Sequence, residues 1–274
     1  MKFFRSRALW FTIYGIIITI LFLYLLFPGH LLKSRLESAA SLAGFNLKSS
    51  SLHASFPLGI KLKNVTLEND SLASGPLFQG ETLNVQYSWQ NLLDKNTHLG
   101  LRGSAYNGSF KGSIAVPSLE RFYPPARANL DFESIDLQKV RLIRNKLGRE
   151  ISGRAKGSLN YKTDAGGKIA DGAVNISISA GSYPLVEPFL GIEKIDFEIG
   201  QIQAVFKDGS IVLEKVEIFG GRVNCLLAGE IIPADNFTQS RLNLRGTIEV
   251  AGKDKIKMQV TIGGTLANPV FKYI

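Results

Sequence analysis

Apolar and polar side chains alternate along most of the chain after Asn46. Clear examples are Val174 to Ser179, Ile195 to Ile199, Leu242 to Arg245 and Ile256 to Ile262. Because successive side chains of a β-strand point to opposite faces, a period of two gives each strand one apolar face and one polar face. Such strands are typical of antiparallel sheets with one face in water. The pattern therefore predicts a mainly β body.

Short glycine-containing sequences separate these segments. Asn107-Gly108, Asp208-Gly209 and Gly220-Gly221 lie between alternating stretches. Gly166 to Lys168 lacks the spaced glycines of a phosphate-binding loop and is interpreted as another turn. Asn-Gly and Asp-Gly supply the positive φ angles that two-residue hairpins need. We expect a meander of hairpins in which residues 45–274 form one antiparallel β domain.

Helical patterns in the body are few and short. Apolar residues recur at helical spacing within residues 28–44, and Gly44 provides a stop. Asp136 can cap a second helix that ends at Gly148. A further helical turn is expected from Val186 to Leu190, between prolines. The body therefore has only two or three short helices with which to cover its sheet.

An uncharged and mostly apolar run extends from Trp10 to Phe27, after a short basic N-terminus. A helix of this length approaches the thickness of a bilayer's hydrocarbon core, about 30 Å. We expect a transmembrane helix over residues 8–27, with residues 1–7 in the cytoplasm because basic flanks stay on that side. The aromatic residues expected to anchor this helix are Trp10, Tyr14, Tyr24 and Phe27.

A cleaved signal peptide is the alternative interpretation of this run. Signal peptides have a shorter apolar core, of about 7 to 15 residues, and a small-x-small cleavage site soon after it. Phe27 to His30 offers no such site. A retained anchor therefore predicts a single-pass protein of the bacterial inner membrane, with residues 28–44 beside the membrane and the β domain in the periplasm.

The net charge of +9 does not indicate a nucleic-acid-binding surface. Residues 1–35 hold five basic and no acidic side chains, which leaves 27 basic against 23 acidic side chains in the rest. No basic stripe with interleaved aromatic residues appears, so we expect no nucleic acid partner. Cys225 is the only cysteine. It excludes an intramolecular disulfide and is interpreted as a small core residue.

Catalytic and metal-binding patterns are not recognised in the chain. His30, His53 and His98 have no ligand at metal-site spacing, and no Ser, His and Asp arrangement can be assembled. Asp131 and Glu133 share one face of a predicted strand, which a solvated strand surface explains. We expect no catalytic residue, metal or cofactor, and a protein that is not an enzyme.

A long sheet with one apolar face must cover that face. A sandwich or a sheet closed on itself would do so with protein alone. The other solution is a strongly bent sheet whose inner face forms an apolar groove able to hold lipid acyl chains, and the alternation is the same in both. The residues expected to line such a groove are Val174, Ile176, Ile178, Ile195, Phe197, Ile199, Leu242, Leu244, Met258 and Val260.

Several phrases of the sequence resemble a known family. Leu213 to Ile231, Ser240 to Gly246 and the ending Ile262 to Phe271 are similar to the C-terminal part of type II secretion system protein N (GspN). The ending, with Phe56 to Leu67 after the apolar run, also resembles the wider AsmA-like envelope proteins. The resemblance implies an anchored periplasmic protein with the bent, AsmA-like form of the sheet.

The resemblance implies two functions and no active site. A GspN-like protein would be a component of the type II secretion system that docks to other envelope components through strand edges or a groove rim. An AsmA-like protein would bind or transfer phospholipid in its apolar groove. The expected partners are therefore the membrane, other secretion components and phospholipid.

Overall fold

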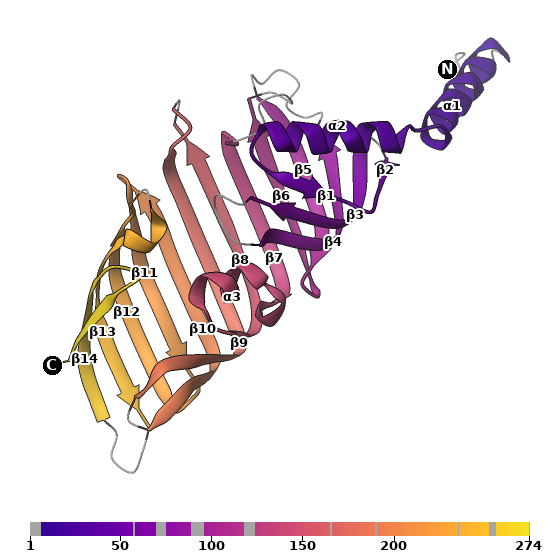
Figure 1. The fold of residues 1–274 in the computed structure, drawn as a ribbon. Coiled ribbons are helices and arrows are strands. Elements are labelled where there is room, and N and C mark those ends of the chain that lie inside the picture. Colours follow the sequence, from indigo (N-terminus) through magenta and orange to yellow (C-terminus); the bar gives the residue numbers. More distant parts are fainter. Residues whose placement is uncertain are drawn as a thin grey trace, which may run out of the picture.

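The computed structural model describes residues 7–56, 58–69, 75–88, 96–117, 124–164, 166–189, 191–234, 236–251 and 256–273. Within these residues, fifteen strands form a single antiparallel sheet (Figure 1). Each strand from β3 to β15 pairs with its neighbour in sequence, while β1 and β2 both pair with β3. The two outer edges of the sheet do not pair with each other, so the sheet is open. The prediction of a mainly β body built as a meander is confirmed.

The sheet begins with short strands and continues with strands of nine residues or more until its last strand. Its strands are β1 (Asn46–Lys48), β2 (Ser51–Ser55), β3 (Gly59–Glu68), β4 (Pro76–Tyr87), β5 (Thr97–Ala105), β6 (Gly108–Val116), β7 (Arg127–Asp136), β8 (Ser152–Thr163), β9 (Ile169–Phe189), β10 (Ile192–Lys207), β11 (Ser210–Phe219), β12 (Val223–Ile232), β13 (Arg241–Val250), β14 (Ile256–Gly264) and β15 (Pro269–Tyr273). The helices are α1 (Arg7–Leu25), α2 (Gly29–Leu42), η3 (Leu137–Lys139), α3 (Arg141–Leu147) and η4 (Phe237–Gln239).

Positive φ angles form the tight turns that the sequence predicted. Asp208 and Gly209, with φ angles of 52° and 80°, connect β10 directly to β11. The turn between β5 and β6 lies one residue earlier than expected, because Tyr106 and Asn107 take the positive φ angles and Gly108 already belongs to β6. Aromatic residues rarely adopt a positive φ angle, so Tyr106 did not indicate a turn in the sequence.

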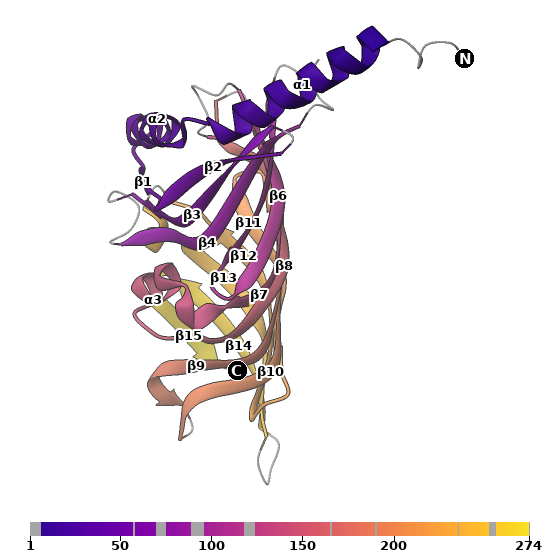
Figure 2. The ribbon, with the colours of Figure 1, turned by 90° about the vertical axis from the view of Figure 1, so that its right-hand side faces the viewer.

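Helix α2 covers the first edge of the sheet. It contacts β1 and β2, and its Leu36 packs with Phe27 against a cluster that contains Leu52 and Leu62. The helix predicted within residues 28–44 is confirmed. Figure 2 shows α2 and α3 on the same side of the sheet, which is the side toward which the sheet curves.

The helix predicted after Asp136 forms in two pieces. The Asp136 carboxylate accepts a hydrogen bond from the Gln138 backbone N–H at 3.2 Å and so caps η3, not α3. Helix α3 then ends at Gly148, whose φ of 67° is the left-handed conformation expected at a helix C-terminus. This pair of helices lies between β7 and β8 in sequence and contacts both β4 and β8.

The helical turn expected from Val186 to Leu190 is wrong. Strand β9 continues through Phe189, opposite Ile192 of β10, and Leu190 lies outside the described residues. Pairing between two long neighbouring strands satisfies the backbone here and outweighs the local signal from the flanking prolines.

The transmembrane span expected over residues 8–27 is not supported. Among the residues that the structure describes, no helix has both the length and the apolar character needed to cross a membrane. Helix α1 has 19 residues and ends at Leu25, two residues before the end of the expected span.

Candidate functional site: an open apolar face

Strand pairing aligns apolar side chains in a continuous row across the sheet. Residues opposite each other in an antiparallel pair share a face, so the row can be followed from strand to strand. Every member is apolar, aromatic or glycine. The central row, with one residue from each strand from β2 to β15, is Leu52, Leu62, Leu83, Gly103, Phe110, Phe132, Gly157, Ile176, Ile202, Val216, Leu227, Gly246, Val260 and Tyr273.

A second row of the same composition lies beside the central row on the same face. It is formed by Ala54, Ile60, Val85, Leu101, Gly112, Leu130, Leu159, Val174, Ala204, Leu213, Gly229, Leu244, Ile262 and Phe271. Two neighbouring rows without a charged or polar side chain make a wide apolar surface.

The opposite face carries the intervening residues, and these are polar. The row between the two apolar rows runs from β2 to β11 as His53, Lys61, Asn84, Arg102, Lys111, Asp131, Ser158, Asn175, Gln203 and Lys215. Because α2 packs on Leu52 and Leu62, the apolar face is the inner face of the curve in Figure 2. The outer face is hydrated.

The central row is covered near its two ends, at β3 and β14, and only half-buried between them. Leu62 and Val260 are each only 1% exposed. Leu62 lies beneath α2 and Phe27, and Val260 lies in a cluster of residues from β11 to β14. From β4 to β13, every member of the central row is only half-buried. We call the two apolar rows between β4 and β13 the open apolar face.

Glycines in the central row make room for aromatic rings. Gly103 lies opposite Phe110, and Gly157 lies opposite Phe132. A Cβ atom at Gly103 would approach the Phe110 ring to 2.6 Å, which is too close for real atoms. The ring therefore occupies the space above the glycine, and the apolar face stays continuous without an additional side chain.

Four of the ten predicted groove residues belong to the two rows of the inner face. Val174 and Leu244 are in the second row, and Ile176 and Val260 are in the central row. Three more flank these rows, each two residues from a row member along the same strand and therefore on the same face. The flanking residues are Ile178, Leu242 and Met258.

The remaining predicted groove residues are on β10, toward the end of the β9–β10 hairpin. Ile199 alternates with Gly200 and Ile202, so it does not continue the central row. The ring of Phe197 is buried against Gly181 and Gly200, and Gly200 is two residues from Ile202 of the central row, so this ring lies on the inner face. Ile195 packs against a separate cluster of Ile192, Val223 and Val250, where the end of the β9–β10 hairpin meets β12 and β13.

The residues predicted to anchor a membrane helix have two different environments. Trp10 and Tyr14 are each 63% exposed on α1. Tyr24 instead donates a hydrogen bond to the Ser55 carbonyl at 3.3 Å, and its ring lies 6.5 Å from that of Phe56. Phe27 packs beside Leu36. The C-terminal end of α1 is therefore attached to the first edge of the sheet.

Cys225 lies on the inner face, next to the open apolar face. It is opposite Ile218 on one side and Ile248 on the other, two residues before Leu227 of the central row. Burial raises the pKa of its thiol to about 11. The thiol is therefore protonated at neutral pH and behaves as an apolar group, in agreement with its interpretation from the sequence.

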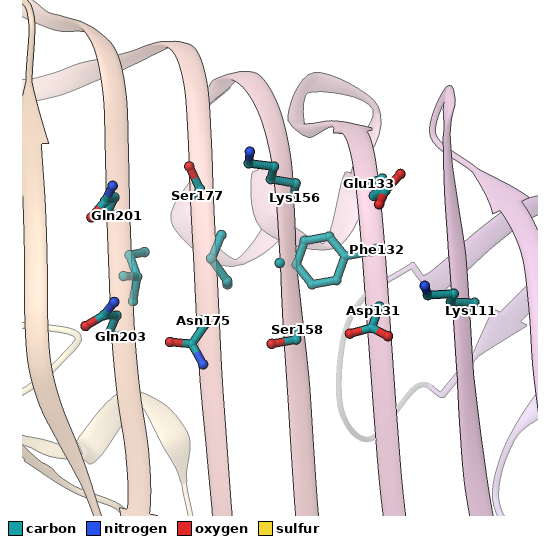
Figure 3. Close-up of a pocket in the computed structure, with 13 residues that line it drawn as sticks. Lys111, Asp131, Phe132, Glu133, Lys156, Ser158, Asn175, Ser177, Gln201 and Gln203 are labelled. Atoms are coloured by element: carbon teal, nitrogen blue, oxygen red, sulfur yellow. The ribbon is translucent and has the colours of Figure 1, made fainter.

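The outer face has a shallow hollow of about 520 Å³, which Figure 3 shows. Ser158, Asn175 and Ser177 place short polar side chains there, and longer ones such as Lys111 and Lys156 surround them. Asp131 and Glu133 belong to the same hollow, where Lys111 lies opposite Asp131. Its charges balance, and within the described residues no three His, Cys, Asp or Glu side chains are placed to hold a metal ion.

Comparison of the chain with models of known protein families, with curated proteins and with solved structures finds no match. The resemblance to GspN and AsmA-like proteins therefore stays a prediction that rests on the sequence phrases.

The contact between Gly103 and Phe110 predicts an unequal response of two glycines in β5. Gly103→Ala would push a methyl group against the Thr82 carbonyl oxygen and into the Phe110 ring, and we expect a loss of about 1–3 kcal/mol of unfolding free energy. Gly100→Ala is the control, because its nearest atom would be 3.8 Å away, and we expect a change below about 0.5 kcal/mol. Urea unfolding followed by circular dichroism measures both; equal destabilisation would contradict the packing described.

The raised pKa of Cys225 predicts slow alkylation. The thiolate is the reactive species, and only about one thiol in a thousand is ionised at pH 8 when the pKa is near 11. We expect the iodoacetamide reaction rate to rise about ten-fold per pH unit up to pH 10, while free glutathione levels off near its ordinary pKa of about 8.5. A plateau for Cys225 near pH 8.5 in protein that remains folded by circular dichroism would show that the thiol is not buried.

Proposed function

We propose that the protein binds lipid acyl chains on the open apolar face, as a lipid-binding or lipid-transfer protein. The observation that supports this proposal is the pair of apolar rows that crosses β4 to β13 without a polar side chain, with the central row only half-buried throughout. A soluble protein rarely leaves so large an apolar surface without a ligand or partner. Acyl chains fit it because they need apolar contact and no hydrogen bond.

The dimensions and energetics of the face suit such a ligand. Strands lie about 4.8 Å apart, so the rows between β4 and β13 extend about 43 Å. One leaflet of a bilayer's hydrocarbon core is about 15 Å thick, which is roughly the reach of a lipid's chains. Burying a chain of about sixteen carbons would contribute on the order of 10 kcal/mol at about 0.8 kcal/mol per methylene, before ordering costs. A single row therefore offers sufficient contact.

A charge placed in the central row tests this function. Ile202→Lys introduces an ammonium group where a chain would lie, whereas Gln201→Lys introduces the same group next to it on the outer face. We expect the first variant to extract a fluorescent phospholipid from vesicles at least about ten-fold less well than the native chain, because contact with hydrocarbon would desolvate its charge. The second variant should match the native chain.

The measurement uses the full chain after removal of bound lipid, with circular dichroism to verify folding. Cys225 provides a second readout, because bound acyl chains on the adjacent rows should slow its alkylation further. The proposal fails if the native chain extracts no lipid, or if the two lysine variants lose extraction equally.

Docking to other secretion components, as the resemblance to GspN implies, is a second candidate function. It is favoured by the last edge of the sheet: among the described residues, β15 has a partner strand on one side only, and all five of its residues are exposed. Val270 and Phe271 are 51% and 49% exposed. An uncovered edge can accept an additional strand from a partner.

A charge beside this edge tests the docking function. Val270→Lys should weaken binding of purified type II secretion components by about ten-fold, because a lysine at an edge disfavours strand addition. Gln259→Lys in β14, one strand inward, is the control and should bind normally. Calorimetric titration that shows no binding by the native chain would exclude these proteins as partners.

A further inference from the structure

A second hollow, of about 500 Å³, lies where η3 and α3 approach β3 and β4. Lys139, Arg141 and Arg144 line it, together with Glu81. Three cations face one anion among the described lining residues, which leaves an excess of two positive charges. We call this hollow the basic pocket.

The contacts that hold the basic side chains of the pocket leave positive charge available for a ligand. The Lys139 ammonium donates to the Asn107 side-chain carbonyl at 2.8 Å, a neutral partner that orients it. Arg144 pairs with Glu150 at 2.9 Å, but both side chains are more than half exposed, so this pair is weak and readily exchanged. Arg141 is the third basic residue of the lining.

Aromatic rings connect the basic pocket with the open apolar face. Tyr106 lines the pocket, and its hydroxyl accepts a hydrogen bond from the Gln79 backbone N–H at 2.8 Å. Its ring contacts Phe78 edge-on at 6.1 Å, and Phe78 contacts Phe110 in the same way at 5.7 Å. Phe110 belongs to the central row. A chain of three aromatic rings therefore leads from the pocket to the central row on β6.

From this arrangement we infer that the basic pocket binds the phosphate headgroup of an anionic phospholipid whose acyl chains lie on the open apolar face. The inference rests on the proposed function and specifies its ligand. A phosphodiester keeps one negative charge and offers acceptor oxygens, which arginine and lysine bind through charge-assisted hydrogen bonds. The basic pocket and the apolar rows are joined, so one ligand can contact both. Such a ligand must combine a negative headgroup with apolar chains.

The test compares short-chain ligands that share chains but differ in headgroup. Calorimetric titration of the full chain would use dihexanoyl phosphatidylglycerol, uncharged dihexanoylglycerol, glycerol phosphate and inorganic phosphate. We expect the phosphatidylglycerol to bind about ten-fold more tightly than the diacylglycerol, which corresponds to one or two charge-assisted hydrogen bonds. The two phosphates without chains should bind at least about a hundred-fold more weakly.

Two double variants separate the basic pocket from general electrostatic attraction. Lys139→Gln with Arg141→Gln should abolish the preference for phosphatidylglycerol and leave diacylglycerol binding unchanged, which also verifies that the variant is folded. Lys111→Gln with Lys156→Gln removes the same charge from the hollow on the outer face and should keep the preference.

Each other result overturns the inference in a distinguishable way. If both lipids bind equally to the native chain, or if the preference survives in the variant of the basic pocket, the headgroup is not bound there while the proposed function stands. If glycerol phosphate binds as tightly as the lipid, the pocket serves a soluble phosphate ester. If neither lipid binds, the proposed function fails together with the inference.

Discussion

Register between neighbouring strands is the constraint on which the rest of this molecule depends. A shift of one residue in any pair would exchange the faces of every later strand, because side chains alternate with a period of two. Apolar side chains stay on the inner face even where their alternation in the sequence is interrupted. Between β10 and β11, Gln203 faces Lys215 while Ala204 faces Leu213, so Glu214 is an extra residue that forms a bulge. The bulge keeps Leu213 and Val216 on the inner face although they are three residues apart.

A single face of one sheet is an unusual place for the apolar side chains of a protein of this size. In most domains a second layer covers such a face. Here α2 covers only the first strands, and clustering of β11 to β14 covers only the last ones. Figure 1 shows the first and the last strands at opposite ends of the molecule, so the sheet does not close on itself. The middle of the sheet is therefore where an apolar ligand replaces the missing layer, in the function proposed here.

Much of the fold follows from local patterns, because each strand pairs with its neighbour in sequence. The alternation in Val174 to Ser179 and the turn at Asp208-Gly209 both predicted what the structure has. The continuity of the rows did not follow from the sequence, since it depends on bulges such as Glu214 that alternation alone does not reveal. The strand character of Val186 to Phe189 and the left-handed turn at Tyr106 were missed for the same reason: partner strands decide them, not local composition.

The candidate site was predicted only in part. Val174, Ile176, Leu244 and Val260 were identified because they alternate regularly, whereas the aromatic members of the central row, Phe110 and Phe132, were missed although they too alternate with polar neighbours. Lys139, Arg141 and Arg144 form a visible basic segment, but nothing local indicates that it faces strands some 60 residues earlier in the chain. Sites assembled from distant segments need the three-dimensional arrangement.

The meander has a consequence for how such a protein can change its size. Each hairpin contributes two strands, restores the original chain direction and preserves the alternation of faces. Insertion or loss of one hairpin would therefore alter the width of the sheet by about 10 Å and leave the assignment of every other residue to its face unchanged. The length of the surface available to a ligand is thus adjustable in discrete modules, much as in solenoid proteins, without redesign of a common core.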